Sequence, residues 1–327
     1  MPDVLTRLKG TPLSVVAGVA AVLLVGNLVL TPDMFAPAQL PSLVNLMIPS
    51  VLAAMASAPS VMAGRGGLDL SIGPLLGFVN VLLVGVLLPH QLGGPVAAIS
   101  ILLLVGATVG LLSGVVVAYG RVQPVVVTLG GYLVLTGYSL VVMPQPVGGV
   151  PVWVRWLSGS WLAGLAPRSL LLVLAAAGVW VLLIRLGAAS TILAVGSDDR
   201  AAFTSGLNVE RTRCLAYALG GLLAALGGIG LSVLIQSGDP TVGRQYTLAA
   251  IAAVALGGNQ LAGGAGTMTG PVLGALSLFL IQTLLSAMHV SSLWIQIVYG
   301  VVLLVALVLN TKLAVRFAAR TQAGAAA

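Results

Sequence analysis

The sequence predicts an all-α polytopic membrane protein with about ten transmembrane segments. Three observations lead to this fold class. Of the 327 residues, 59% are hydrophobic and 6% are charged, whereas a soluble domain carries about 25% charged residues. The apolar residues fall into runs near the roughly 17–25 residues that a bilayer-spanning helix requires. The 42 glycines suit helices that pack closely in a bilayer. This composition excludes a water-soluble enzyme.

Ten apolar runs are the candidate spans: 13–30, 43–63, 69–88, 95–118, 125–143, 168–186, 213–236, 245–258, 267–287 and 292–310. The first run could be a signal peptide, but it exceeds the usual apolar core and no convincing cleavage site follows, which favours an uncleaved anchor. The eighth run is too short to cross unaided, so we expect a broken helix or a re-entrant segment. We treat residues 1–327 as a single transmembrane domain.

The net charge of +7 does not indicate a nucleic-acid partner, because the basic residues stand singly between apolar runs. With ten spans and both termini in the cytoplasm, three basic residues face outward: Arg155, Arg168 and Arg244. The inward set is Arg7, Lys9, Arg65, Arg121, Arg185, Arg200, Arg211, Arg213, Lys312, Arg316 and Arg320. The positive-inside rule therefore favours cytoplasmic N- and C-termini.

Two connections interrupt the hydrophobic pattern. The outer stretch 144–167 is rich in proline, which opposes a regular helix, and in tryptophan, which suits the headgroup boundary. In the inner stretch 187–212, Ser197 or Asp198 can cap a short helix across Asp199–Thr204, and Gly206 can end it. Such a helix is either a docking element for a soluble partner or part of a solvated loop. The candidate docking residues are Ser197, Asp198, Asp199, Arg200, Phe203, Gly206 and Asn208.

No motif for catalysis, metal binding or ATP hydrolysis is recognisable in the sequence. Lys9 and Lys312 lie outside any glycine-rich phosphate loop, so ATP is not bound through a Walker A motif. His90 and His289 stand singly at span ends and are not expected to bind a metal. We expect Cys214 to pack as a small apolar side chain, and we expect neither a cofactor nor enzymatic activity.

A series of polar residues runs through the apolar spans. Its only ionisable member is Asp69, near the inner end of its span, and so little charge argues against proton or sodium coupling. A path of hydroxyls and amides suits a neutral, hydroxyl-rich solute. Arg65 either contacts Asp69 at an i,i+4 spacing or only marks the inner side. The members are Asn45, Asp69, Ser71, Asn80, Thr128, Tyr132, Gln236, Asn259, Gln282 and Gln296.

An internal similarity links two distant stretches of the chain. Residues 66–77 read GGLDLSIGPLLG and residues 263–274 read GGAGTMTGPVLG. Each stretch follows one apolar segment and opens the next. Transporters are often built from repeats with interrupted helices around the substrate path, so this pattern indicates a transporter.

Four motifs resemble those of permease subunits from bacterial ABC importers for monosaccharides of the ribose, arabinose, xylose and galactose type. They are GGLDLSIG at 66–73, QPVVVTLGG at 123–131, AVGSDDRAAFTSGLNV at 194–209 and AAIAAVALGGNQLAGGAGTMTGPVLGA at 249–275. The four occur in the family's order and span roughly residues 40 to 310.

The resemblance implies a type II importer fold in the bacterial inner membrane, surrounded by lipid. It implies a cytoplasmic ABC ATPase that couples to residues 197–208, a periplasmic sugar-binding protein and a second permease subunit. The family usually carries an acidic pair, E-L-D, where this chain has Thr247, Leu248 and Ala249. We therefore expect a heterodimer with a different permease, with a homodimer as the alternative. Other open readings are a furanose signal, nucleoside, polyol or branched-chain amino acid as substrate, or a facilitator without an ATPase.

Overall fold

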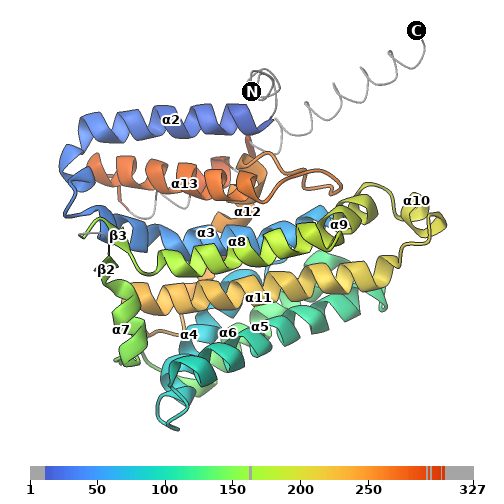
Figure 1. The fold of residues 1–327 in the computed structure, drawn as a ribbon, viewed down its shortest axis with the longest axis horizontal. Coiled ribbons are helices and arrows are strands. Elements are labelled where there is room, and N and C mark those ends of the chain that lie inside the picture. Colours follow the sequence, from blue (N-terminus) through green and yellow to red (C-terminus); the bar gives the residue numbers. More distant parts are fainter. Residues whose placement is uncertain (1–11, 162–163, 292–293, 295–296, 303, 306–327) are drawn as a thin grey trace.

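The structure is a computed structural model, and it describes residues 12–161, 164–291, 294, 297–302 and 304–305. Most of the predicted tenth span, with Gln296 inside it, lies outside these residues, as do Arg7, Lys9, Lys312, Arg316 and Arg320. The long helices run roughly side by side along one direction (Figure 1). This arrangement is the one expected for helices that cross a bilayer.

The α-helices are α2 (Pro12–Leu30), α3 (Leu40–Met62), α4 (Ile72–Val81), α5 (Pro95–Ala118), α6 (Pro124–Val142), α7 (Val152–Ser158), α8 (Leu170–Arg185), α9 (Ala188–Ser197), α10 (Asp199–Thr204), α11 (Val209–Ile235), α12 (Gln245–Leu256) and α13 (Thr269–Ala287). Short elements join them: the 3-10 turns η1 (Pro32–Phe35) and η3 (Val242–Arg244), and the π-helical turn η2 (Leu82–Leu87). The strands are β1 (Val147–Gly148), β2 (Ser160–Trp161), β3 (Ala166–Pro167) and β4 (Ser237–Gly238).

Six of the described helices are long and apolar enough to cross a membrane, namely α2, α3, α5, α6, α11 and α13. The pair α8 and α9 would be a seventh span, but the two helices are bent by 77° at their junction. Two shorter apolar segments, Ile72–Leu87 and Val242–Leu256, coincide with the predicted third and eighth spans. The multi-pass helical architecture is therefore confirmed, while the number of ten crossings stays a prediction.

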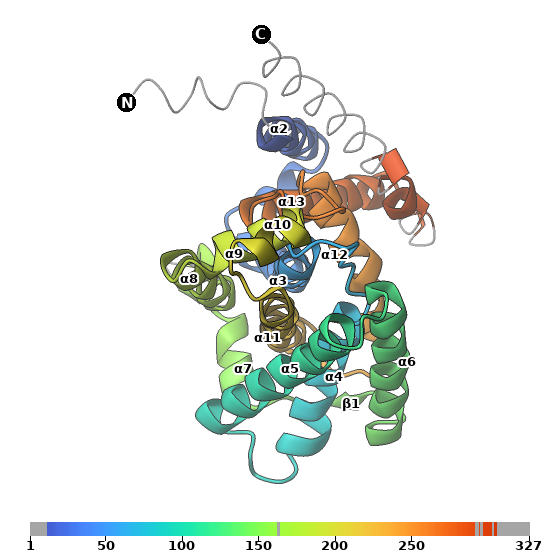
Figure 2. The ribbon, with the colours of Figure 1, turned by 90° about the vertical axis from the view of Figure 1, so that its right-hand side faces the viewer.

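Helix α11 lies at the centre of the bundle, with α3, α5 and α8 around it and α2 and α6 at the rim (Figure 2). It packs most extensively on α5, where Gly106 and Gly221 bring the two backbones together. A Cβ on Gly106 would lie 2.7 Å from the Cβ of Ala225, so a larger residue there would push the helices apart. Cys214 is buried in this interface beside Gly114, as expected for a small apolar side chain.

The proline-rich stretch 144–167 contains a helix, which corrects the prediction that proline excludes one there. Helix α7 starts directly after Pro151, a position at which the missing N–H and the fixed φ of proline are compatible with a helix start. Trp153 donates from Nε1 to the carbonyl oxygen of Gly93 at 2.7 Å. The Arg168 guanidinium lies 4.6 Å from the ring centre of Trp156. These contacts hold the stretch against the ends of neighbouring helices.

Two antiparallel strand pairs were not predicted from the sequence. Strand β1 pairs with β4, and β2 pairs with β3. Each strand has only two residues, too few for a period-2 pattern to be recognisable. The first pair joins the connection after α6 to the connection after α11, so it links segments about ninety residues apart in the chain.

Candidate functional site

The inner stretch 187–212 forms a two-helix element at the end of the bundle opposite α7 (Figure 1). Helix α10 covers Asp199–Thr204 as predicted. Asp198 caps it, because its Oδ1 accepts from the backbone N–H of Arg200 at 2.8 Å and of Ala201 at 3.1 Å. Ser197 is not the cap, since its hydroxyl donates to the carbonyl oxygen of Ala194. The preceding helix α9 was not predicted.

The turn after α10 also follows the sequence expectation. Gly206 has a φ of +85°, the left-handed geometry that lets the chain reverse after a helix. Asn208 caps the next helix, α11, by accepting from the backbone N–H of Arg211 at 2.8 Å. The connection between α10 and α11 thus has a left-handed glycine after the first helix and a side-chain cap before the second.

One side of α10 is buried and the other faces solvent. Ala202 packs with Val195 and Val209 in a small apolar cluster that fixes α10 on its neighbours. Phe203 points away from this cluster and is 68% exposed, and Arg200 is exposed as well. Aromatic residues and arginine are enriched in protein interfaces, so the exposed Phe203 and Arg200 can contribute to a docking surface.

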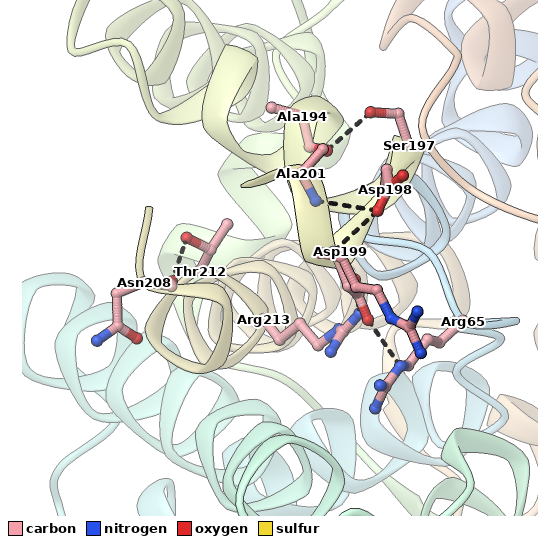
Figure 3. Close-up of polar contacts among 10 residues, drawn as sticks. Arg65, Ala194, Ser197, Asp198, Asp199, Ala201, Asn208, Thr212 and Arg213 are labelled. Atoms are coloured by element: carbon pink, nitrogen blue, oxygen red, sulfur yellow. Dashed lines mark hydrogen bonds and ion pairs between the residues drawn. The ribbon is translucent and has the colours of Figure 1, made fainter. Parts of the chain in front are cut away.

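Asp199 differs from its neighbours because its carboxylate is engaged inside the chain. Its Oδ2 lies 2.8 Å from Nε of Arg65, and its Oδ1 accepts from the guanidinium of Arg213 (Figure 3). The side chain of Arg213 is 5% exposed and that of Arg65 is 57% exposed. The docking candidate Asp199 thus joins α10 to α11 and to the segment that follows α3.

The prediction that Arg65 contacts Asp69 at an i,i+4 spacing is wrong. Residues 64, 65 and 66 all have positive φ, so the segment is not helical and i,i+4 neighbours do not share a face. Asp69 is 2% exposed and accepts from the backbone N–H of Ser71 at 2.9 Å and from its hydroxyl at 2.6 Å. It stabilises the turn that leads into α4.

Several residues of the predicted polar path bond to their own chain. Asn80, with 0% exposure, donates to the Ser232 hydroxyl at 2.8 Å and the Ser237 carbonyl at 2.9 Å, and accepts from the N–H of Asp239 at 2.9 Å. Thr128 is equally buried and donates to the carbonyl oxygen of Leu68. These side chains join α4 to α11, and α6 to the turn before α4.

The remaining path candidates lie in separate places. Asn45 donates to the carbonyl oxygen of Ser158 at 3.1 Å and accepts from the hydroxyl of Ser169, which ties α3 to the start of α8. Gln236 ends α11 in a left-handed conformation with a φ of 53°. Tyr132 is half-buried on α6, and buried Asn259 accepts from the N–H of Thr267.

The contacts described above place the path candidates between different pairs of segments. A hollow of about 440 Å³ lies between η2 and the residues that follow α6, and the path candidates do not line it. Gln282 is the path residue that lies exposed on a described span. Its Oε1 accepts from the hydroxyl of Tyr299 at 2.8 Å, a partner that the sequence analysis missed because Tyr299 is an isolated aromatic in an apolar run.

The two similar stretches occupy equivalent positions in the fold. Helix α4 begins at Ile72 and α13 at Thr269, each six residues after the first glycine of its stretch. The loops before these helices both reach the end of α9. A Cβ on Gly264 would lie 2.4 Å from Cα of Ser197, and a Cβ on Gly64 would lie 2.8 Å from Cα of Gly196.

A bundle of long apolar helices with a capped, solvent-facing helix pair at one end defines a polytopic membrane protein. The chain matches the family model described as "Branched-chain amino acid transport system / permease component" over residues 39–307. The chain therefore belongs to this family of permeases, and the resemblance to permeases of monosaccharide importers is confirmed.

Individual relatives agree with the family. The ribose import permease of Escherichia coli (strain K12) is 34% identical over 275 residues, 80% of this chain and 83% of the relative. The ribose import permease of Bacillus subtilis (strain 168) is 32% identical over 76% of this chain and 77% of the relative. An autoinducer 2 import system permease of E. coli (strain K12 / DH10B) is 33% identical over 80% and 76%. No solved structure matches the chain.

Proposed function

We propose that the chain is the transmembrane permease subunit of an ATP-driven ABC importer that moves a monosaccharide across the bacterial inner membrane. The observation that carries this proposal is the family match together with the exposed, doubly capped helix α10 between two spans. The chain crosses the membrane ten times with both termini in the cytoplasm, and α10 lies on the cytoplasmic side.

A partner ATPase docks on α10. Support comes from the exposed Phe203, whose ring offers an apolar contact, and from the exposed Arg200, three residues before it on the same helix. ATP binding moves this helix and switches the pathway between outward and inward access. A periplasmic sugar-binding protein delivers the solute at the opposite end, near α7.

The translocation pathway runs along the face of α13 that carries Gln282. An amide in a bilayer span needs a hydrogen-bonding surrounding, because hydrocarbon offers none. Tyr299 satisfies one of its acceptor sites, and a neutral, hydroxyl-rich sugar or a facing subunit satisfies the others. The candidates Asn45, Asn80 and Thr128 do not contact the solute, and they support the pathway by holding its helices in place.

The facing subunit is a second permease, and we expect it to differ from this chain. Thr247, which replaces the first acid of the family pair, is buried in α12, and Ala249 is half-buried. A homodimer would lack the acids on both sides of its two-fold axis. Affinity purification of the tagged chain in mild detergent, followed by mass spectrometry, should recover a distinct permease. A complex with two copies of this chain as its only membrane subunits would contradict this.

The experiment that tests the function is uptake into proteoliposomes that contain the purified complex, with the binding protein and labelled D-ribose outside and ATP inside. We expect uptake that requires both the binding protein and ATP. A complex whose ATPase carries an inactivated catalytic site is the matched control. Ribose entry at the same rate without ATP would instead identify a facilitator.

Autoinducer 2 is a second candidate substrate, because relatives from two bacteria are named autoinducer 2 import permeases. The same proteoliposomes with autoinducer 2 in place of ribose distinguish the two solutes. Direct binding of each to the periplasmic protein, measured by calorimetry, should give the same preference.

A further inference from the structure

We propose that Asp199 is a positioning residue that ties the docking helix α10 to the body of the permease. Movement of α10 then reaches α11 and the two repeat loops together; these are residues 63–71 before α4 and residues 257–268 before α13. This inference rests on the proposed function. It separates two roles within the coupling segment: Phe203 contacts the ATPase, and Asp199 transmits the movement. It concerns the residues around Asp199, Arg65 and Arg213 in Figure 3.

The carboxylate of Asp199 is occupied by its own chain. One oxygen pairs with Nε of Arg65 at 2.8 Å and the other with the guanidinium of Arg213. The Asp199 side chain is 25% exposed, against 68% for Phe203. Because both oxygens have a cationic partner, the charge of the Asp199 carboxylate is compensated within the chain before any partner protein binds.

The two arginines come from different parts of the fold. Arg213 belongs to the first turns of α11, the central helix, and its side chain is 5% exposed. Its Nε is buried without a hydrogen-bond partner in the described chain, so Asp199 is the group that compensates this cation. Removal of Asp199 would leave a buried charge unpaired.

Arg65 carries the contact to the first repeat loop. It lies between Gly64 and Gly66, and all three residues have positive φ. A non-glycine residue in this region requires support from its surroundings, and the ion pair with Asp199 supplies a contact from outside the loop. Movement of α10 is thereby passed to the turn that opens α4.

The second repeat loop is joined at the same place through backbone contacts. Gly196, at the end of α9, fits so closely that a Cβ on it would lie 2.7 Å from the nitrogen of Gly264. The N–H of Gly264 in turn bonds to Met62 at the end of α3. The end of α9 therefore packs directly against both loops through glycine backbones. The ion pair between Asp199 and Arg65 adds a side-chain contact to the first loop.

The test uses the complete complex in proteoliposomes and compares Asp199→Asn, Arg65→Gln and Phe203→Ala. Two quantities are measured: the amount of ATPase that co-purifies, and ATP hydrolysis with and without the binding protein. D-ribose uptake is recorded in parallel. Glu210→Gln is the matched control, because it removes one acid from the same end of the bundle, at the start of α11, and no described ion pair involves Glu210.

We expect Phe203→Ala to lose the ATPase from the complex. Asp199→Asn and Arg65→Gln should retain it, while hydrolysis stimulated by the binding protein and uptake fall about tenfold or more, the size of a typical coupling between sites. Asp199→Glu should restore part of the coupling, and the double variant Asp199→Asn with Arg65→Gln should be no worse than Asp199→Asn alone. Glu210→Gln should behave as the wild type.

Two results would overturn the inference. In the first, Asp199→Asn and Arg65→Gln release the ATPase as Phe203→Ala does, which would make Asp199 part of the docking surface. In the second, both variants keep wild-type hydrolysis and uptake. Arg65 is exposed, so Arg65→Gln remains informative if Asp199→Asn fails to fold. A wild-type complex without any ATPase would instead refute the proposed function itself.

Discussion

Replacement of Asn80 by leucine tests whether the polar residues of the spans line the pathway or hold the helices together. Asn80 is fully buried and makes three hydrogen bonds, to the side chain of Ser232 and to the backbone of Ser237 and Asp239. Leucine has a similar size but can make none of them.

The loss can be estimated from these bonds. At about 0.5–1.5 kcal/mol for each hydrogen bond, the three together contribute about 1.5–4.5 kcal/mol. Bonds between membrane helices lie near the lower end of that range, at about 0.6 kcal/mol on average. We therefore expect Asn80→Leu to destabilise the fold by about 2 kcal/mol, with uptake per folded molecule close to that of the wild type.

The assay is thermal unfolding of the purified complex in detergent, together with uptake normalised to folded protein. Gln282→Leu is the matched control, because Gln282 is exposed and has one recorded bond, to Tyr299. It should leave Tm nearly unchanged but reduce uptake. If Asn80→Leu keeps the wild-type Tm and loses uptake, Asn80 lines the pathway and the structural interpretation is refuted.

Two further predictions concern the repeat loops. Gly196→Ala should lower Tm and coupling, because its Cβ would overlap the carbonyl oxygen of Met62. Gly178→Ala, at an open helical position, should leave Tm unchanged or raise it by the equivalent of about 0.5–1 kcal/mol; equal Tm values for both alanine variants would contradict the close packing. Asp69→Asn should retain the fold, since the amide oxygen can still accept both bonds from Ser71, whereas Asp69→Leu should cost about 1–3 kcal/mol by leaving a buried N–H unpaired. Equal unfolding temperatures for Asn and Leu variants would show that these bonds contribute little.

Features that depend on nearby residues were predictable. The bounds of α10 follow from Asp198 and Gly206, because a cap and a left-handed turn are decided within a few residues of chain. The same locality explains why α4 and α13 start at equivalent points of the two similar stretches. Helix α9 was missed because it lacks the length of a span and a side-chain cap at its start.

Features that depend on distant residues were not predictable. Arg65 was paired with Asp69 by spacing, but three successive positive φ values turn it toward Asp199 instead. Asn80 looked like a pathway residue because an amide in an apolar run gives no sign of its partners, which lie about 150 residues further along the chain.

The sequence by itself determined that this protein lies in a membrane, where its long apolar helices are, and to which family it belongs. Apolar run lengths define membrane spans because unsatisfied backbone groups are costly in lipid, and four motifs in order identify the permease. The tertiary structure alone decided which polar side chains have a hydrogen-bond or ion-pair partner within the chain. It assigned Asp199 to Arg65 and Arg213, and left Phe203 and Gln282 exposed. Burial and pairing arise from the packing of distant segments, and no local pattern of residues encodes them.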